Sequence, residues 1–196
     1  MRRQWLSPML LAAAMLAYVG AICFAPGAEA DSVAFDGTSS GLFGRLDLTT
    51  GVFTQTATLD GITPTGLGEL GSALYTGEYQ GTGFYKLNPV TGAATLISTT
   101  GLNGNEYVAL GSTLTGIYGL DASGNLYSID PTTGASILIG ATGVVPSSDP
   151  TTGLEAFNLS TGSTTLYYAE LNQLYSVNTS TGAATSIGPT GHGHRG

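Results

Sequence analysis

Runs of alternating apolar and polar residues follow one another along the chain from residue 32 onward, and turn-forming residues separate them. The segment between Gly116 and Gly143 shows the pattern clearly. Residues 117–121, 126–129 and 136–139 alternate as half-buried strands do, with a Gly-containing turn between successive runs. A shorter apolar run precedes these three. The unit therefore predicts four consecutive antiparallel strands, and no helical period appears after the first 30 residues.

Four copies of one turn phrase set the length of the unit. In each copy an Asp or Asn is followed four residues later by Gly, and the glycines lie 41, 42 and 48 residues apart. The Asp or Asn side chain is expected to accept hydrogen bonds from the turn backbone, and the Gly to adopt a left-handed conformation. We assign these residues a structural role in tight turns: Asp47 and Gly51, Asn88 and Gly92, Asp130 and Gly134, and Asn178 and Gly182.

The period and the strand pattern together predict an all-β fold, a β-propeller of about four four-stranded antiparallel blades. The blades are expected at residues 31–60, 61–101, 102–145 and 146–190, followed by a disordered tail at 191–196. The first unit begins late and lacks one strand, and no later strand is left to complete it. The pattern leaves three outcomes open: imperfect closure of the ring, self-association through open strand edges, or a shortened member of a longer family.

Residues 1–30 have the pattern of an export signal peptide. Arg2 and Arg3 precede an apolar run, and Ala28-Glu29-Ala30 is a small-x-small cleavage site. Cys23, the only cysteine, lies inside this segment, so the mature chain has no disulfide and no thiolate metal site. We expect an exported protein, periplasmic, cell-surface or extracellular, with no membrane span in the mature chain.

The charge balance argues against nucleic acid as a partner. Five Lys and Arg residues face 13 Asp and Glu residues, which gives a formal net charge of −8. An acidic surface repels phosphate backbones. The only histidines, His192 and His194, lie in the tail, so the repeats cannot build a Ser-His-Asp triad or a multi-histidine metal centre.

The segment 125–134 resembles the repeat of secreted bacterial β-propellers. It is similar to the quinoprotein-type repeat, in which a Leu-Tyr-x-hydrophobic-Asp strand precedes a Thr-Gly turn. The resemblance covers most of residues 32–190 and implies the propeller fold. Quinoprotein repeats usually carry a Trp after this turn that docks one blade onto the next, but the only Trp here is Trp5. Quinone cofactor binding is therefore not implied.

A recurring carboxylate is the leading candidate for a metal site. Such a residue precedes each Leu-Tyr strand, and equivalent positions in a propeller form a ring at one face. A ring of carboxylates attracts Ca²⁺, which prefers oxygen ligands. The alternative is that each acid accepts backbone hydrogen bonds in its own hairpin. The four residues are Asp36, Glu78, Asp121 and Glu170.

Glu106 and Glu155 form a second candidate set, because each lies twelve residues before a tyrosine, Tyr118 or Tyr167. On an innermost strand their carboxylates would face the central channel and could act as a catalytic acid–base pair. Solvated acids at strand ends are the alternative interpretation.

The sequence favours an exported, non-enzymatic β-propeller that binds a protein, a glycan or a cell-envelope component through the loops of one face, without a cofactor. Two alternatives stay open. One is a propeller-type lyase or hydrolase that uses Glu106 and Glu155, with Ca²⁺ as a possible cofactor. The other is a truncated, non-functional relative.

Overall fold

The computed structural model describes residues 33–37, 40–47, 49–147, 153–158 and 164–189. The expected signal peptide with Cys23, and the tail with both histidines, lie outside the described residues. Within the described ranges, no helix is long and apolar enough to cross a membrane.

The described strands form four antiparallel sheets, in each of which strands adjacent in sequence are paired. Sheet 1 contains β1 (Val33–Gly37), β2 (Leu42–Asp47) and β3 (Phe53–Thr58). Sheet 2 contains β4 (Gly68–Leu70), β5 (Ala73–Gly77), β6 (Phe84–Leu87) and β7 (Ala94–Ser98). Sheet 3 contains β8 (Ala109–Thr113), β9 (Gly116–Leu120), β10 (Asn125–Ile129) and β11 (Ser136–Ala141). Sheet 4 contains β12 (Gly153–Asn158), β13 (Thr164–Glu170), β14 (Gln173–Val177) and β15 (Ala184–Pro189).

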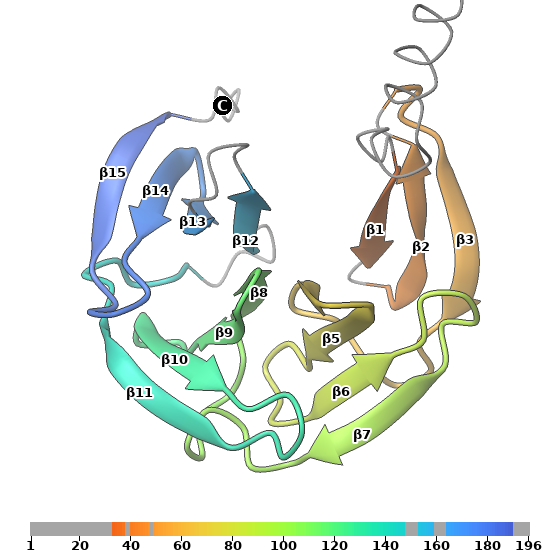
Figure 1. Ribbon diagram of the computed structural model, residues 1–196, viewed down its shortest axis with the longest axis horizontal. Coiled ribbons are helices and arrows are strands. Elements are labelled where there is room, and N and C mark those ends of the chain that lie inside the picture. The colour runs from red at the N-terminus through yellow and green to blue at the C-terminus, as the bar shows by residue number, and fades with distance from the viewer. Residues whose placement is uncertain (1–32, 38–39, 48, 148–152, 159–163, 190–196) are drawn as a thin grey trace, which may run out of the picture.

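The four sheets stand around a common axis as the blades of a propeller, with β3, β7, β11 and β15 on the outer circumference (Figure 1). Near the axis, β8 contacts both β4 and β12. The ring is open, because a gap separates sheet 4 from sheet 1. The prediction of an all-β propeller with a three-stranded first blade and doubtful closure is therefore confirmed.

Hydrogen bonds within the four turn phrases explain why the chain reverses there. The Asp47 Oδ1 atom accepts bonds from the backbone nitrogens of Thr49 and Thr50, at 2.8 and 3.0 Å. Asn88, Asp130 and Asn178 accept the same two bonds in their own turns. The phrase glycines have φ angles between 69° and 82°, a region that strongly favours Gly.

Each sheet also has a β-bulge at the same place. In each sheet the register between the last two strands shifts near the start of the first of these strands, so the outer strand contains one extra residue there. The extra residues are Thr56, Ile97, Ile139 and Ile187. A bulge bends and twists its strand.

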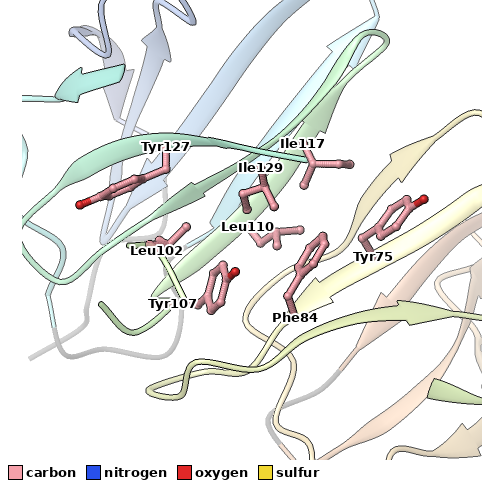
Figure 2. Packing of buried hydrophobic residues seen from close by; sticks show 8 residues of the cluster. All are labelled: Tyr75, Phe84, Leu102, Tyr107, Leu110, Ile117, Tyr127 and Ile129. Atoms are coloured by element: carbon pink, nitrogen blue, oxygen red, sulfur yellow. The ribbon is translucent and has the colours of Figure 1, made fainter. Parts of the chain in front are cut away.

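Apolar side chains fill the spaces between neighbouring sheets. Figure 2 shows the cluster between sheets 2 and 3, where Tyr75, Phe84 and Tyr107 lie in a row. The ring centroids of Tyr75 and Phe84 are 5.7 Å apart, and those of Phe84 and Tyr107 are 6.3 Å apart. Complete burial of a side chain such as Leu110 stabilises the fold by roughly 1.5–3 kcal/mol. Similar clusters join sheets 1 and 2 and sheets 3 and 4.

The phrase glycine has a second role where one blade meets the blade before it. A Cβ atom on Gly92 would lie 2.3 Å from the Cβ of Ala57, and one on Gly134 would lie 2.4 Å from the Cβ of Ser98. The turn backbone therefore packs directly on the outer strand of the preceding sheet, and no side chain fits between them. We call this the glycine contact. It occurs at Gly92 on Ala57, Gly134 on Ser98 and Gly182 on Gly140.

Candidate functional site: the loop face

Loops of two kinds gather at one end of the molecule. They are the hairpin loops between the second and third strands of a full blade and the connections between sheets. Backbone hydrogen bonds join them, among them Tyr79 N to Thr63 O at 2.7 Å and Gly101 N to Thr82 O at 3.1 Å. We call this surface the loop face; it comprises residues 40–41, 59–67, 78–83, 99–108, 121–124, 142–147 and 171–172.

Asp121 is buried within the loop face, with 3% of its surface exposed. Its carboxylate accepts bonds from the backbone nitrogens of Ser123 and Asn125, both at 2.9 Å, and from Asn125 Nδ2 at 3.0 Å. The Tyr127 hydroxyl donates a fourth bond at 3.0 Å. Burial, helped by this bond to Asp121, raises the pKa of Tyr127. The carboxylate thus holds its own hairpin and a neighbouring tyrosine in place.

Glu170 makes a comparable connection in sheet 4. It is also buried, and it accepts a 2.8 Å bond from the backbone nitrogen of Ser147, which lies in the connection from sheet 3. The Tyr168 hydroxyl donates a bond to its other oxygen. Burial, together with this bond, raises the pKa of Tyr168. Glu170 therefore ties a hairpin to the preceding inter-sheet connection.

Glu78 is half-buried in the hairpin loop of sheet 2, and the chain folds closely around it. A Cβ atom on Gly81 or Gly83 would lie 2.7 Å from an atom of the Glu78 side chain. Burial raises the pKa of Tyr85, and the charge of Glu78 adds to that effect.

The strand register shows that Asp36 is not equivalent to these acids. Phe35 pairs with Arg45 just as Tyr75 pairs with Lys86, so Asp36 corresponds to Thr76. The other three are equivalent: Glu78 and Asp121 directly follow β5 and β9, and Glu170 is the last residue of β13. Asp36, Glu78, Asp121 and Glu170 thus lie on four different sheets, and in the described part of the chain no three His, Cys, Asp or Glu residues form a group that could hold a metal ion. A Ca²⁺ site at these acids stays a prediction.

The structure does not place Glu106 and Glu155 at equivalent positions. Glu106 is exposed in the connection before β8, whereas Glu155 is within β12 and pairs with Tyr167. The residue that pairs with Tyr118 is Gly111, which is therefore the equivalent of Glu155. The side chain of Glu155 lies outside the described residues. Both glutamates lie twelve residues before a tyrosine only because the connections between them and that tyrosine differ in length. The backbone therefore does not place Glu106 and Glu155 at matching positions of their blades.

Two shallow cavities lie beside the connection between sheets 1 and 2. One, of about 310 Å³, is lined by residues 57–60, Ile62 and 91–94. The other, of about 270 Å³, is lined by residues 40–41 and 58–63. Asp60 is the single ionisable residue in either lining. General acid–base catalysis by a pair of carboxylates would need a second acid beside Asp60, and neither lining supplies one.

An exposed polar patch on the loop face was not anticipated from the sequence. We call it the amide patch; it comprises Gln80, Asn103, Asn105 and Glu106. Its two loops are tied together, because Gln80 N donates to Tyr107 O at 3.0 Å and Tyr107 N donates to Gly81 O at 2.9 Å. The Asn105 amide donates to the Tyr127 hydroxyl at 3.1 Å, which connects the patch to Asp121. The polar run 103–106 between two apolar segments is the signal that could have identified it.

The backbone of the amide patch is strained. Gln80 and Asn103 have φ angles of 52° and 55°, in the left-handed region that non-glycine residues rarely adopt. Strain of this kind costs on the order of 1–3 kcal/mol and persists only where the surrounding structure enforces it. Gln80 is held by the bond from its backbone nitrogen to Tyr107 O, and Asn103 by a 2.7 Å bond from its backbone nitrogen to Ser136 Oγ. Both side chains are exposed on a fixed backbone, which suits the recognition of a polar ligand.

Comparison with solved structures supports the fold. No family model and no curated protein matches the chain. Among solved structures, a Bacteroides thetaiotaomicron protein of unknown function has a TM-score of 0.60 and 15% identity over 82% of this chain. A structure of the nidogen/laminin complex has a TM-score of 0.56 and 12% identity over 82% of this chain. An auxiliary nutrient binding protein from Bacteroides thetaiotaomicron has a TM-score of 0.51 and 9% identity over 83% of it.

The chain spans 42%, 62% and 40% of the length of these three structures, respectively. At such low identity the likeness concerns the fold alone, and a fold of this kind hosts many activities. Function must therefore be argued from the loop face.

Proposed function

We propose that the protein is an exported, non-enzymatic binding module that recognises an extracellular protein or a glycan through the amide patch. The observation that carries the proposal is the pair of strained residues, Gln80 and Asn103, held at the same corner of the loop face. Strained, exposed polar residues on a rigid support are typical of binding sites. A preorganised surface loses little conformational entropy when its ligand binds.

The chemistry of the patch favours a neutral or basic polar ligand. Three amide groups supply both donors and acceptors, and Glu106 supplies a negative charge. Tyr79 lies beside the patch, and its hydroxyl accepts a bond from Gln80 Nε2 at 3.4 Å. The net charge of −8 disfavours an acidic partner. Two neighbours of the same fold give general support: one structure is named as a nidogen/laminin complex and another as an auxiliary nutrient binding protein.

The test uses panels of glycans and of cell-envelope proteins, with the wild-type chain and a Gln80→Gly, Asn103→Gly double variant. Glycine removes both side chains and relieves the left-handed strain, so we expect a gain in stability of about 1 kcal/mol at Gln80 and a smaller gain at Asn103, because Asn adopts this region more readily. Binding of any ligand found is expected to fall at least about tenfold.

A matched control is Leu171→Gly. Leu171 is the third described non-glycine residue with a positive φ, 52°, but it lies in the hairpin of sheet 4. This variant should gain similar stability and keep full binding. Absence of binding to both panels, or unchanged binding by the double variant, would refute the proposal.

A further inference from the structure

The two open sides of the arc carry complementary halves of the contact that joins blades inside the molecule. At internal boundaries the phrase glycine of one blade packs on the outer strand of the blade before it. The phrase glycine of sheet 1, Gly51, has no described atom within 4 Å of the position that a Cβ atom would occupy, and the same is true of Gly188 in sheet 4. Gly188 follows its phrase glycine by six residues, as Ala57, Ser98 and Gly140 follow theirs. The phrase glycine, Gly51, is thus uncovered on one side of the gap, and the small residue of the outer strand, Gly188, is uncovered on the other.

The side of sheet 4 that faces the gap repeats the apolar pattern of the internal blade faces. Leu174 occupies the position of Phe84 and Leu126, both of which are fully buried, but Leu174 is only half-buried. Ile187 occupies the bulge position of Ile97 and Ile139, which pack on the neighbouring core clusters, whereas 55% of Ile187 is exposed. We call Leu174, Ile187 and Gly188 the tail face.

The side of sheet 1 that faces the gap has the matching pattern. Leu46 occupies the position of Leu87, Ile129 and Val177, which have 1%, 4% and 4% of their surface exposed, but Leu46 is half-buried. Gly44 stands where the other blades have a tyrosine, and the ring of Phe53 covers the position that its Cβ would occupy, at 2.7 Å. We call Gly44, Leu46, Gly51 and Phe53 the head face.

We propose that the tail face of one copy of this chain packs on the head face of a second copy. The internal interfaces define which surface fits the tail face, namely one with a phrase glycine and an apolar residue at the position of Leu46. The head face supplies both. Figure 1 shows the gap between sheet 4, which carries the tail face, and sheet 1, which carries the head face, so the two faces do not touch in this structure. The residues of both faces are uncharged, and their burial is favourable.

This contact is heterologous, because it joins two different surfaces. It forms a closed ring if the rotation between copies closes, and an open chain if it does not. In this contact the face of one sheet stacks on the face of another. It therefore differs from self-association through exposed strand edges, in which the strands of two copies would hydrogen-bond side by side.

The test measures the mass of the chain, expressed from its full-length sequence, by sedimentation over a wide concentration range. The wild type is expected to associate as concentration rises. Ile187→Asp places a charge on the tail face and should weaken association by at least about tenfold. The matched control is Ile137→Asp, which changes an isoleucine that is 70% exposed on the outer strand of sheet 3, away from both open sides.

A mixing experiment identifies the heterologous geometry. Leu46→Asp blocks the head face and Ile187→Asp blocks the tail face, so each variant alone should stay monomeric. Their mixture should form a 1:1 dimer, because one intact head and one intact tail remain. Val52→Asp, at a residue 58% exposed beside Gly51, replaces Leu46→Asp if that variant does not fold. A monomeric wild type at every concentration, equal loss in the Ile137→Asp control, or a mixture without dimer would overturn the proposal.

Discussion

Replacing Gly134 and Gly51 by alanine separates the two roles of the phrase glycine. Both residues have nearly the same backbone, with φ angles of 71° and 72°. Alanine in this left-handed region costs about 1–2 kcal/mol at either site. At Gly134 the new Cβ would also lie 2.4 Å from the Cβ of Ser98, whereas at Gly51 it meets no described atom within 4 Å.

The contact at Gly134 adds a second cost. Forcing extra atoms into a close-packed contact typically destabilises a protein by about 1–3 kcal/mol. Gly134→Ala should therefore lower the free energy of unfolding by about 2–5 kcal/mol, and Gly51→Ala by about 1–2 kcal/mol. The difference between the two variants measures the glycine contact itself.

Urea unfolding, followed by circular dichroism at concentrations where the chain is monomeric, gives these free energies. Ser98→Gly removes the atom that would clash, so it should recover part of the loss in Gly134→Ala and none of the loss in Gly51→Ala. The denaturant dependence must stay the same across variants for the comparison to hold. Equal destabilisation by Gly134→Ala and Gly51→Ala would refute the idea that the phrase glycine joins neighbouring blades.

Three further predictions concern one buried hydroxyl group and two carboxylate groups, of which Asp121 is buried and Asp130 is exposed. Tyr107 is fully buried, its hydroxyl has no hydrogen-bond partner among the described residues, and burial raises its pKa; Tyr107→Phe should therefore raise the free energy of unfolding by about 1 kcal/mol, and a loss of stability in urea would contradict this. Backbone hydrogen bonds from Thr132 lower the pKa of Asp130 below 3.8, so its stabilising effect is complete above that value and is lost as pH falls through the lowered pKa. Asp130→Asn should accordingly match the wild type in thermal melts at neutral pH and lose less stability below about pH 4; parallel acid curves would show that the turn does not titrate. The Asp121 carboxylate accepts four hydrogen bonds, so Asp121→Asn should lower the free energy of unfolding by about 1–3 kcal/mol in urea, and an unchanged stability would contradict a structural role. Melting with and without Ca²⁺ tests the predicted ion site, because a Ca²⁺-dependent rise that the variant loses would establish it.

The sequence predicted the blades because their turns are local. A phrase such as Asp130–Gly134 sets its own hydrogen bonds and its own φ, so four copies imply four hairpins of one kind. The strands between phrases alternate with period 2, and the packing of one blade on the next follows from that alternation. A three-stranded first sheet was predictable for the same reason.

Positions that depend on loop length could not be predicted by counting residues. Asp36 appeared equivalent to Glu78, but the hairpin of sheet 1 differs in length, and the register places Asp36 two positions earlier in its strand. Glu106 and Glu155 were paired by an equal offset from a tyrosine. The turn between β8 and β9 has two residues, whereas the connection between β12 and β13 has five, so the offset does not mark equivalent positions.

The glycine contact was missed although its signal is in the sequence. A small residue follows each phrase glycine at the sixth position: Ala57, Ser98, Gly140 and Gly188. The spacing within one phrase predicts the turn. The contact lies between two blades, where the phrase glycine of one blade meets the sixth-position small residue of the blade before it. The amide patch was missed for a related reason, since Gln80 and Asn103 are far apart in sequence and hydrogen bonds between loops bring them together.

The glycine contact also bears on how such a gene can change. Because each full blade presents a glycine on one side and a small residue on the other, an in-frame duplication of residues 102–145 would insert a unit that fits both of its neighbours. Recombination between repeats can therefore lengthen or shorten the protein in whole blades, whereas a deletion of a few codons between a phrase glycine and its sixth-position residue would disturb the contacts of that blade alone.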